Sequence, residues 1–551
     1  MLKPELIKDL SIPLEFNRDL LFEFFPRRPT VKILIVADTS VSFTSSFGVG
    51  RVIDLIRDNV DNYVNFEVDL ARLGTQSSTL SVNNSPTGHD PKYTNFRFSS
   101  QVSGNHVIDD YDQIWCFGFA PGNDGSSNDN NIWNSPYATT DADLAVLTPW
   151  MNNGGGMLAM GDHHYLGAAM CARIPRVGSM RRWTNAQGVP PIGGPPRFDT
   201  TRPDIPGSFN IGSQSDGTPQ PIEWKKYPVR DFLVFRKTYR PHPVLCGGDL
   251  GVIDVLPDHA HEGHIYADTE ILLNQTYSFS GVTGDEYPTS GTIQATPEVI
   301  AWANTLADPP YNFSKGETPA RRFGLIGAYD GDLVDTGRVL VDSTWHHWMD
   351  INLGGLEAES PNTEFQKIAR YFRNCAVWLS RKGQRTKMLN YSSFWAVIHV
   401  ANFEDLNTFT PLYALGRQGI DAAGRLTSDC LVSEWINIFI DDLIWEMEWD
   451  KYLTNPKIPH PDPCWSCPPI DYIRATIYGG VIRKMAAYRD EVYMQIHEGK
   501  KPKLSPRYID KAFKEGVELG RKEVYRSFEE NLEYMSIQFE RLKAFDGKKR
   551  K

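Results

Sequence analysis

The chain has 551 residues, of which 41% are hydrophobic and 23% are charged, and its formal net charge is -11. This composition supplies enough apolar material for a folded core, so it excludes disorder of the whole chain. The acidic balance argues against a dedicated nucleic-acid-binding protein, whose surface would carry a basic patch. At roughly 150 residues per domain, the length predicts two large domains or three to four smaller ones.

The sequence shows no targeting or membrane segment. No stretch approaches the roughly 18 uninterrupted apolar residues of a membrane-spanning helix. Residues 1–20 lack the apolar core of a signal peptide and carry several acidic side chains. The seven cysteines are odd in number and mostly scattered, which does not suggest a disulfide framework. We therefore expect a soluble, cytoplasmic protein without membrane contact.

After an N-terminal extension (residues 1–30), short apolar runs alternate with helical patterns. The run at residues 31–37 is apolar and β-branched, which is typical of a strand buried on both faces. Strands that alternate with helices predict βαβ units, and hence a mainly parallel sheet flanked by helices in flavodoxin-like layers. Further strands are expected at residues 66–70, 112–119, 157–160, 251–256, 323–329 and 337–342, and helices at residues 52–60 and 140–151.

The α/β domain is predicted to span residues 31–358. Residues 184–230 interrupt it with a Pro- and Gly-rich stretch. A structureless loop of this length is uncommon inside a compact domain, so we expect an ordered insertion that packs over the site. The segments predicted to follow are a helical region (359–454), a Pro-rich linker with a helix (455–504) and a long C-terminal amphipathic helix (505–551).

Apolar residues of the C-terminal helix recur mostly at steps of three and four. They are Phe513, Val517, Val524, Phe528, Leu532, Met535, Phe539 and Leu542. The spacing is typical of a long amphipathic helix or a short coiled coil. Because soluble monomers rarely expose such a stripe, we expect it to pack on the helical region, on a protein partner or on a second copy. The sequence leaves the choice between these open.

Seven of the 13 histidines lie in three short segments. Residues 161–164 follow the predicted strand at 157–160, residues 257–264 follow the one at 251–256, and residues 342–347 end the one at 337–342. Sites in open α/β sheets form beyond the carboxyl ends of the strands. We therefore expect the three segments to converge on one pocket, although a single histidine beside a strand is more often structural.

The residues that we expect to form this site are Asp162, His163, His259, His261, Glu262 and His346. Imidazole and carboxylate together suit a divalent metal such as zinc, manganese or iron. In that interpretation His163, His259, His261 and His346 are metal ligands, and Glu262 or Asp162 is the general base for a bound water. Without a metal, one histidine is the base and the carboxylates orient it.

Three sequence stretches resemble a known superfamily. The GGGMLAMGDHH stretch at residues 154–164 resembles the point where class I glutamine amidotransferase-like domains turn from strand to helix. The His242-Pro243 stretch with residues 258–262 is similar to the "HP…G" and acidic stretch of ThuA-like proteins. Gly337-Arg338-Val339, with residues 346–347, resembles their late "G-R-V…H" strand. The resemblance covers about residues 31–355 and implies an amidotransferase-like fold and a carbohydrate-type substrate.

One departure from that superfamily bears on the chemistry. Amidotransferases place a nucleophilic cysteine where this chain has residues 160–163, Met-Gly-Asp-His, and Cys171 lies too far along. This argues against glutamine hydrolysis through a thioester. We predict a hydrolase- or lyase-type enzyme for a small molecule, with or without a divalent metal. The alternative is a catalytically inactive scaffold or binding protein in a larger bacterial assembly.

Overall fold

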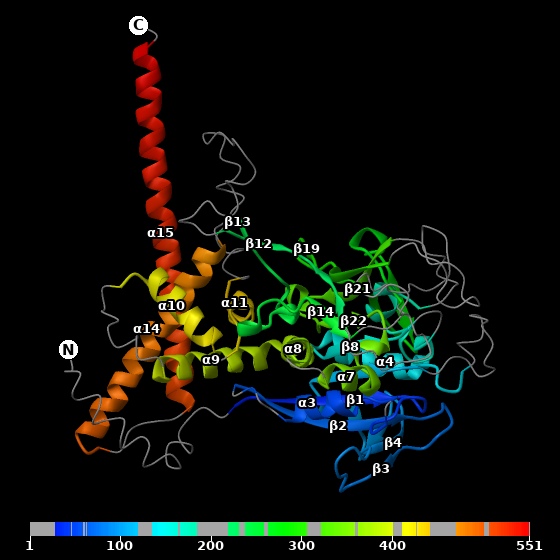
Figure 1. Cartoon of the computed structure of the whole chain (residues 1–551). Helices are drawn as coiled ribbons and strands as arrows, with labels where there is room; N and C mark the ends of the chain where they lie inside the picture. Colours follow the sequence, from blue (N-terminus) through cyan, green and yellow to red (C-terminus); the bar gives the residue numbers. More distant parts are fainter. Residues whose placement is uncertain are drawn as a thin grey trace. The chain divides into compact units, whose positions relative to one another are not determined.

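The computed structural model describes residues 28–45, 47–58, 61, 63–119, 135–162, 166–183, 219–230, 237–257, 263–305, 321–358, 362–399, 410–425, 427–440, 470–500 and 506–549 (Figure 1). The chain divides into two compact units. The sheet unit comprises Thr30–Tyr227 and Arg240–Arg385, and the helical unit comprises Met1–Pro29, Pro228–Tyr239 and Thr386–Lys551. Among the helices described, none combines the length and the apolar character that crossing a membrane requires.

A 12-stranded sheet forms the centre of the sheet unit. Its middle is a run of parallel strands in the order β22-β8-β7-β1-β2-β4. The chain enters the sheet at β1, continues to β2 on one side, and then returns to β7 on the other side of β1. The bounds are β1 (Thr30–Ala37), β2 (Asn65–Leu73), β4 (Tyr93–Phe96), β7 (Gln113–Phe117), β8 (Gly156–Met160) and β22 (Val339–Asp342).

The outer strands of this sheet are antiparallel to their neighbours, so the prediction of a mainly parallel sheet is wrong. The α/β class is correct, but the sheet is mixed. The connection from β21 to β22 spans only residues 330–338, whereas a parallel crossover needs a dozen or more residues, so these neighbours run in opposite directions. The antiparallel strands are β3 (Ser81–Val82), β9 (Arg181–Arg182), β11 (Glu223–Trp224), β15 (His264–Ile265), β20 (Glu298–Thr305) and β21 (Arg321–Tyr329).

The strand expected at residues 251–256 does not belong to the central sheet. Its observed form, β14 (Val255–Pro257), pairs with β10 (Pro219–Pro221) in a separate two-stranded sheet. Proline has no N–H to donate and is confined to strand edges, which disfavours a central position for either strand. Residues 184–218 of the expected insertion lie outside the described residues. The other small strands are β5 (Gln101–Val102), β6 (Asn105–His106), β12 (Tyr227–Arg230), β13 (Lys237–Arg240), β16 (Thr276–Phe279), β17 (Val282–Asp285), β18 (Thr289–Ser290) and β19 (Ile293–Gln294).

Helices cover both faces of the sheet. On one face, α4 (Asp141–Asn152), α5 (Ala168–Cys171) and α6 (Val177–Met180) share a buried cluster with sheet residues such as Ile114 and Cys116. Side chains alternate along a strand, so Trp115 and Phe117 face the other layer, where both pack edge-on against Trp348. That layer contains α3 (Gly50–Arg57), α7 (Asp350–Glu357) and α8 (Thr363–Trp378).

The start of α4 matches the sequence prediction. Thr140 is its N-cap and forms a capping box with Asp143, which satisfies backbone N–H groups of the first turn. Gly154, with φ of +87°, follows the last turn and takes the left-handed conformation that commonly ends helices. The chain then enters β8 directly, which brings residues 161–162 to the carboxyl edge of the sheet.

The helical unit packs through glycine. Its helices are α9 (Lys382–His399, which begins at the end of the sheet unit), α10 (Leu412–Gly424), α11 (Asp429–Asn437), α14 (Ile470–His497) and α15 (Pro506–Lys549). A Cβ atom on Gly480 of α14 would lie 2.2 Å from the carbonyl oxygen of Gly516 on α15. Only glycine permits so close an approach of two helix backbones. Phe513, Val517 and Val524 of the predicted stripe are buried here.

The described cysteines are of two kinds. Cys116, Cys171 and Cys375 are free and buried in the sheet unit. Cys246 and Cys430 are disulfide-bonded, which their scattered spacing does not predict.

Candidate functional site

The six parallel strands end at the same edge of the sheet, and three of them lead into an acidic residue. Asp38 follows β1, Asp162 comes two residues after β8, and Asp342 is the last residue of β22. The strand order reverses at β1 and β7, and crevices at such switch points are the usual ligand sites of open α/β sheets. The chain therefore concentrates carboxylates where the topology favours a site.

Asp162 and His346, two of the predicted site residues, are brought together here. The Nε2 atom of His346 lies 3.3 Å from Oδ2 of Asp162. Thr344 links the two, because its hydroxyl donates to Oδ1 of Asp162 at 3.3 Å and accepts the backbone N–H of His346 at 3.1 Å. Both side chains are almost completely buried, with 1% of Asp162 and 2% of His346 exposed.

The loop after β8 is shaped by glycine and closed by its own hydrogen bond. The N–H of Asp162 donates to the carbonyl of Leu166 at 3.0 Å, which turns the chain sharply. A Cβ atom on Gly161 would lie 2.6 Å from both that carbonyl and the ring of Trp183. The tight turn therefore requires glycine before Asp162 and fixes the position of the carboxylate.

Arg181 ties the three predicted segments together. Its Nη2 donates to the carbonyls of Asp162 and Ser343, at 2.5 and 2.8 Å. Gly263, which directly follows the segment 258–262, donates its N–H to the same carbonyl of Ser343 at 2.9 Å. A side chain at position 263 would collide with the guanidinium, at 2.1 Å from Nη2. The described residues that flank the three histidine segments thus meet around one arginine.

The charge of Arg181 is retained despite its complete burial. Burial lowers the pKa of its guanidinium to about 10, an effect that the nearby Asp162 carboxylate opposes. The group is therefore still cationic at pH 7. A positive charge behind Asp162 and Asp342 balances part of their negative charge in a region that water does not reach.

The second histidine of the 346–347 pair has a different role. His347 is fully buried and its Nδ1 lies 2.7 Å from Oδ1 of Asp342. The other oxygen of Asp342 accepts from Trp348 Nε1 at 3.0 Å and from the Tyr371 hydroxyl at 3.2 Å. These contacts hold η8 (Trp345–His347) against the sheet, so we interpret His347 and Asp342 as the structural support of His346.

Aromatic rings from three strand-end loops cluster beside His346, the partner of Asp162. Trp345 packs on the imidazole of His346, with ring centroids 3.7 Å apart. It also contacts Phe119, beyond β7, at 5.0 Å and Phe47, beyond β1, at 5.4 Å. Asp38 accepts the N–H of Phe119 at 2.6 Å and so connects the ends of β1 and β7.

The other predicted site residues are outside the described part of the chain. His163, His259, His261 and Glu262 all belong to segments that the structure does not describe. Within the described residues, no group of three or more His, Cys, Asp or Glu side chains is arranged to hold a metal ion. The metal site therefore remains a prediction, for which Asp162 and His346 are the described members.

Sequence reasoning did not select three residues of this arrangement. In the sequence, Arg181 belongs to an arginine-rich stretch, and Thr344 and Asp38 lie just after predicted strands. The available signal for Asp38 is its position directly after the first parallel strand. Arg181 offers no comparable signal, because the sequence does not indicate that β9 pairs with β15 beside Gly263.

The free cysteines of the sheet unit are not placed as nucleophiles. Cys116 and Cys171 lie in the buried cluster beneath the sheet, and burial raises the pKa of the Cys116 thiol well above its usual value, with Cys171 beside it. A reactive cysteine needs a thiolate in an accessible, electropositive position. Neither cysteine therefore supplies the nucleophile that residues 160–163 lack.

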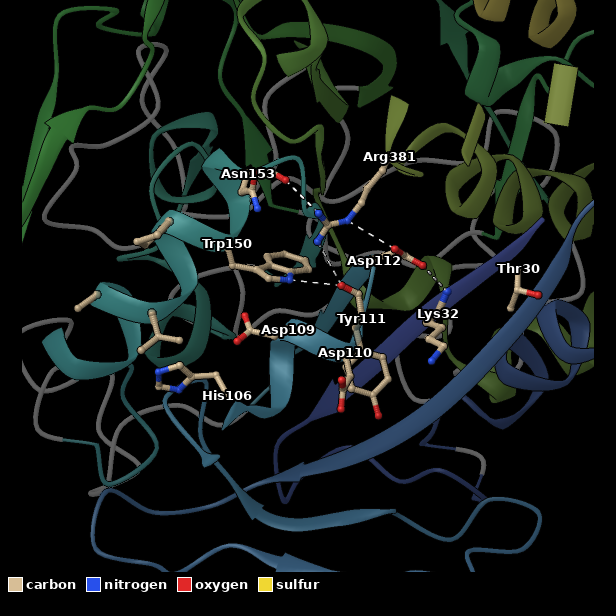
Figure 2. Close-up of a pocket in the computed structure, with 13 residues that line it drawn as sticks. Thr30, Lys32, His106, Asp109, Asp110, Tyr111, Asp112, Trp150, Asn153 and Arg381 are labelled. Atoms are coloured by element: carbon tan, nitrogen blue, oxygen red, sulfur yellow. Dashed lines mark hydrogen bonds and ion pairs between the residues drawn. The ribbon is translucent and has the colours of Figure 1, made fainter. Parts of the chain in front are cut away.

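A cavity lies at the opposite edge of the sheet (Figure 2). It measures about 870 Å³ and is bounded by Lys32 at the start of β1 and by Asp109 of η1 (Val107–Asp110). Arg381 closes its floor, donating to the carbonyls of Asn153 at 3.0 Å and Tyr111 at 3.4 Å. Because these residues precede the parallel strands, the cavity is remote from Asp162 and His346.

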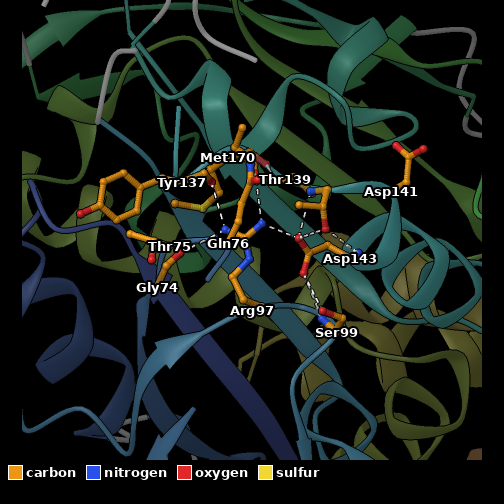
Figure 3. Close-up of polar contacts among 12 residues, drawn as sticks. Gly74, Thr75, Gln76, Arg97, Ser99, Tyr137, Thr139, Asp141, Asp143 and Met170 are labelled. Atoms are coloured by element: carbon orange, nitrogen blue, oxygen red, sulfur yellow. Dashed lines mark hydrogen bonds and ion pairs between the residues drawn. The ribbon is translucent and has the colours of Figure 1, made fainter. Parts of the chain in front are cut away.

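A buried ion pair stabilises the carboxyl end of β2 (Figure 3). Arg97 donates to Asp143, the third residue of α4, and to the carbonyls of Gly74 and Ala138 at 3.1 and 2.7 Å. Ser99 adds two further hydrogen bonds to the Asp143 carboxylate, at 3.0 and 3.2 Å. A smaller cavity of about 460 Å³ lies beside this network.

Comparison with protein-family models, curated proteins and solved structures finds no match to this chain. The inference of function therefore rests on the residues of the chain itself.

Proposed function

We propose that the sheet unit is a hydrolase- or lyase-type enzyme that acts through Asp162 and His346 without a cysteine nucleophile. The observation that carries this proposal is the 3.3 Å contact between the two side chains at the carboxyl edge of the sheet. Imidazole exchanges protons near neutral pH, and a neighbouring carboxylate orients it and stabilises its protonated form. Arg181 adds a fixed positive charge behind the pair, which suits a reaction that develops negative charge.

The pair also fits a divalent metal. Ligand atoms about 2.0–2.1 Å from a tetrahedral metal lie roughly 3.3–3.4 Å from one another. The 3.3 Å separation of Oδ2 and Nε2 matches this spacing. We propose His163, His259 and His261 as the further ligands and Glu262 as a general base. A bound zinc, manganese or iron ion would supply Lewis acidity and lower the pKa of a water.

A carbohydrate-type substrate is the first class to test. This choice rests on the resemblance of residues 31–355 to ThuA-like proteins. The order of the parallel strands, with β1 between β2 and β7, supports an amidotransferase-like arrangement of the same kind.

The proposal can be tested with chromogenic glycosides, esters and lactones, each with and without Zn²⁺, Mn²⁺ or Fe²⁺. Asp162→Asn and His346→Gln should each lower turnover by roughly 100-fold or more, as loss of a general acid or base does. His106→Gln is the matched control, because His106 lines the cavity at the other edge of the sheet. Equal turnover in all four proteins, or no turnover of any substrate under any condition, would contradict the proposal.

The second candidate is a non-catalytic scaffold, which the burial of the pair favours. With 1% of Asp162 and 2% of His346 exposed, the two side chains can serve as an internal connection between β8 and β22. Metal analysis of the purified protein separates the two candidates. A stoichiometric metal that is lost in both Asp162→Asn and His346→Gln supports the enzyme, whereas a metal-free and inactive protein supports the scaffold.

A further inference from the structure

We propose that the second half of α15 is a self-association surface, through which two copies of this chain pair as an antiparallel coiled coil. The first half of α15 is already covered within its own unit. There α14 runs antiparallel to it, as shown by the contacts of Lys484 with Glu515 at 3.2 Å and of Tyr472 with Ser527 at 2.9 Å. Tyr472 is the third residue of α14, so the N-terminal end of α14 lies beside Ser527 of α15.

Residues 528–549 therefore continue α15 past the end of α14, over about 33 Å at 1.5 Å per residue. Figure 1 shows this part of α15 extending beyond α14 and α10. Most of the stability of a helix in a protein comes from the packing of an amphipathic face rather than from intrinsic propensity. Its sequence supplies an apolar side for such packing, which calls for a covering surface.

The apolar positions in this half form a heptad seam. They are Phe528, Leu532, Met535, Phe539 and Leu542, spaced alternately by four and three residues. In heptad notation, positions 532 and 539 are a, and positions 528, 535 and 542 are d. Ile537 falls at the outermost position, f, and its side chain is 45% exposed. The seam continues the upstream stripe that packs on α14, because a step of seven residues keeps the heptad phase and Phe528 follows Val524 by four residues.

The charges beside the seam favour a second copy in antiparallel orientation. When position 532 of one copy lies opposite 542 of the other, and 535 opposite 539, the e positions of the two copies face each other. Glu529 then lies opposite Lys543, and this pair occurs twice in the dimer. In a parallel dimer, Glu529 would lie opposite Val524 and Lys543 opposite Gln538, with no pair of opposite charges. The sequence beside the seam is therefore complementary to itself in one orientation.

Charge reversal in the full-length chain tests this proposal. The wild type should be dimeric in sedimentation equilibrium. Glu529→Lys and Lys543→Glu should each weaken dimerisation by roughly tenfold, because both symmetric pairs become repulsive. The double variant should recover the wild-type dissociation constant. Glu530→Lys, the same charge change at an outer position, should leave it unchanged.

A mixing experiment separates self-association from the other occupants of this surface. An equimolar mixture of Glu529→Lys and Lys543→Glu should form a heterodimer that is tighter than either homodimer, because every facing pair is then of opposite charge. Circular dichroism should show unchanged helix content in each variant. A wild type that is monomeric at every concentration would mean that the seam packs within the chain or on another protein, and it would overturn the proposal. A mixture no tighter than the single variants would overturn the antiparallel pairing.

Discussion

Replacement of Asp143 by asparagine is expected to destabilise the sheet unit by about 3 kcal/mol. Asp143 is fully buried, and its carboxylate forms an ion pair with the buried guanidinium of Arg97 (Figure 3). Breaking a buried ion pair from one side typically costs about 3–5 kcal/mol, because the remaining charge is left without compensation. The lower end applies here, since Arg97 keeps its hydrogen bonds to the carbonyls of Gly74, Tyr137 and Ala138.

Thermal unfolding followed by circular dichroism measures this effect. For a unit of this size, 3 kcal/mol corresponds to a fall in melting temperature of roughly 4 °C. Asp141→Asn is the matched control, because Asp141 lies in the same helical turn but is half exposed where it pairs with Arg173. An exposed pair contributes about 0–1 kcal/mol, so the control should shift the melting temperature by at most about 1 °C. Equal shifts in the two variants would refute the argument from burial.

The same variant predicts a pH dependence. Burial alone would raise the pKa of Asp143, but the charge of Arg97 and the hydrogen bonds from Arg97 and Thr140 outweigh it and hold the pKa below its usual value. The unfolded chain therefore binds the proton more readily than the folded protein. The stabilisation is complete above the unfolded pKa, near 3.9, and is lost as pH falls through the folded pKa. The difference between wild type and Asp143→Asn should therefore shrink below about pH 4, and a constant difference down to pH 2 would contradict this linkage.

Three further outcomes follow from particular residues. Gly480→Ala should destabilise the helical unit by about 1–3 kcal/mol, because the new Cβ atom would collide with the backbone of α15. Gly383→Ala is the control: this helical position has open space around it, so the change should be neutral or stabilising by up to about 1 kcal/mol. Denaturation curves of the two variants measure the difference. Burial raises the pKa of Asp350 to about 6, so the folded protein holds this proton more tightly than the unfolded chain does. The wild type should therefore gain stability relative to Asp350→Asn as the pH falls from 7 to 4. A difference in melting temperature that does not change with pH would argue against this. Burial raises the pKa values of the Cys116 and Cys375 thiols well above the usual range. Both cysteines should therefore resist iodoacetamide in the native protein, which peptide mass spectrometry can measure. Rapid labelling of either cysteine would contradict its burial.

The meeting of Asp162 and His346 could be predicted because it depends on a general property of parallel sheets. Both residues follow apolar runs that are unambiguous as strands, and the carboxyl ends of parallel strands share one edge. The start of α4 was predictable for a similar reason, since Thr140 and Asp143 form a local signal that needs no distant partner.

The direction of the outer strands and the membership of β14 could not be predicted in the same way. Both depend on which distant strand has a free edge for pairing. The spacing of apolar residues indicates that a segment is a strand but not which strand it pairs with. Connection length was the usable signal for β21 and β22, because residues 330–338 are too few for a helical crossover. For β14 the usable signal was Pro257, which disfavours a central strand.

The charges at the carboxyl edge are themselves an argument for a function. Asp162, Arg181 and His346 are removed from water, and transferring such groups into a protein interior costs several kcal/mol for each charge before their mutual attraction is counted. Apolar side chains of similar volume join two strand ends at least as well, so connecting β8 to β22 does not require this set. An acid–base pair or a metal site does require it, because both need titratable groups held at a fixed separation with their charge balanced nearby. Asp162 and His346 are held at 3.3 Å by Thr344, with Arg181 adjacent, and the proposed acid–base or metal chemistry rests on this arrangement.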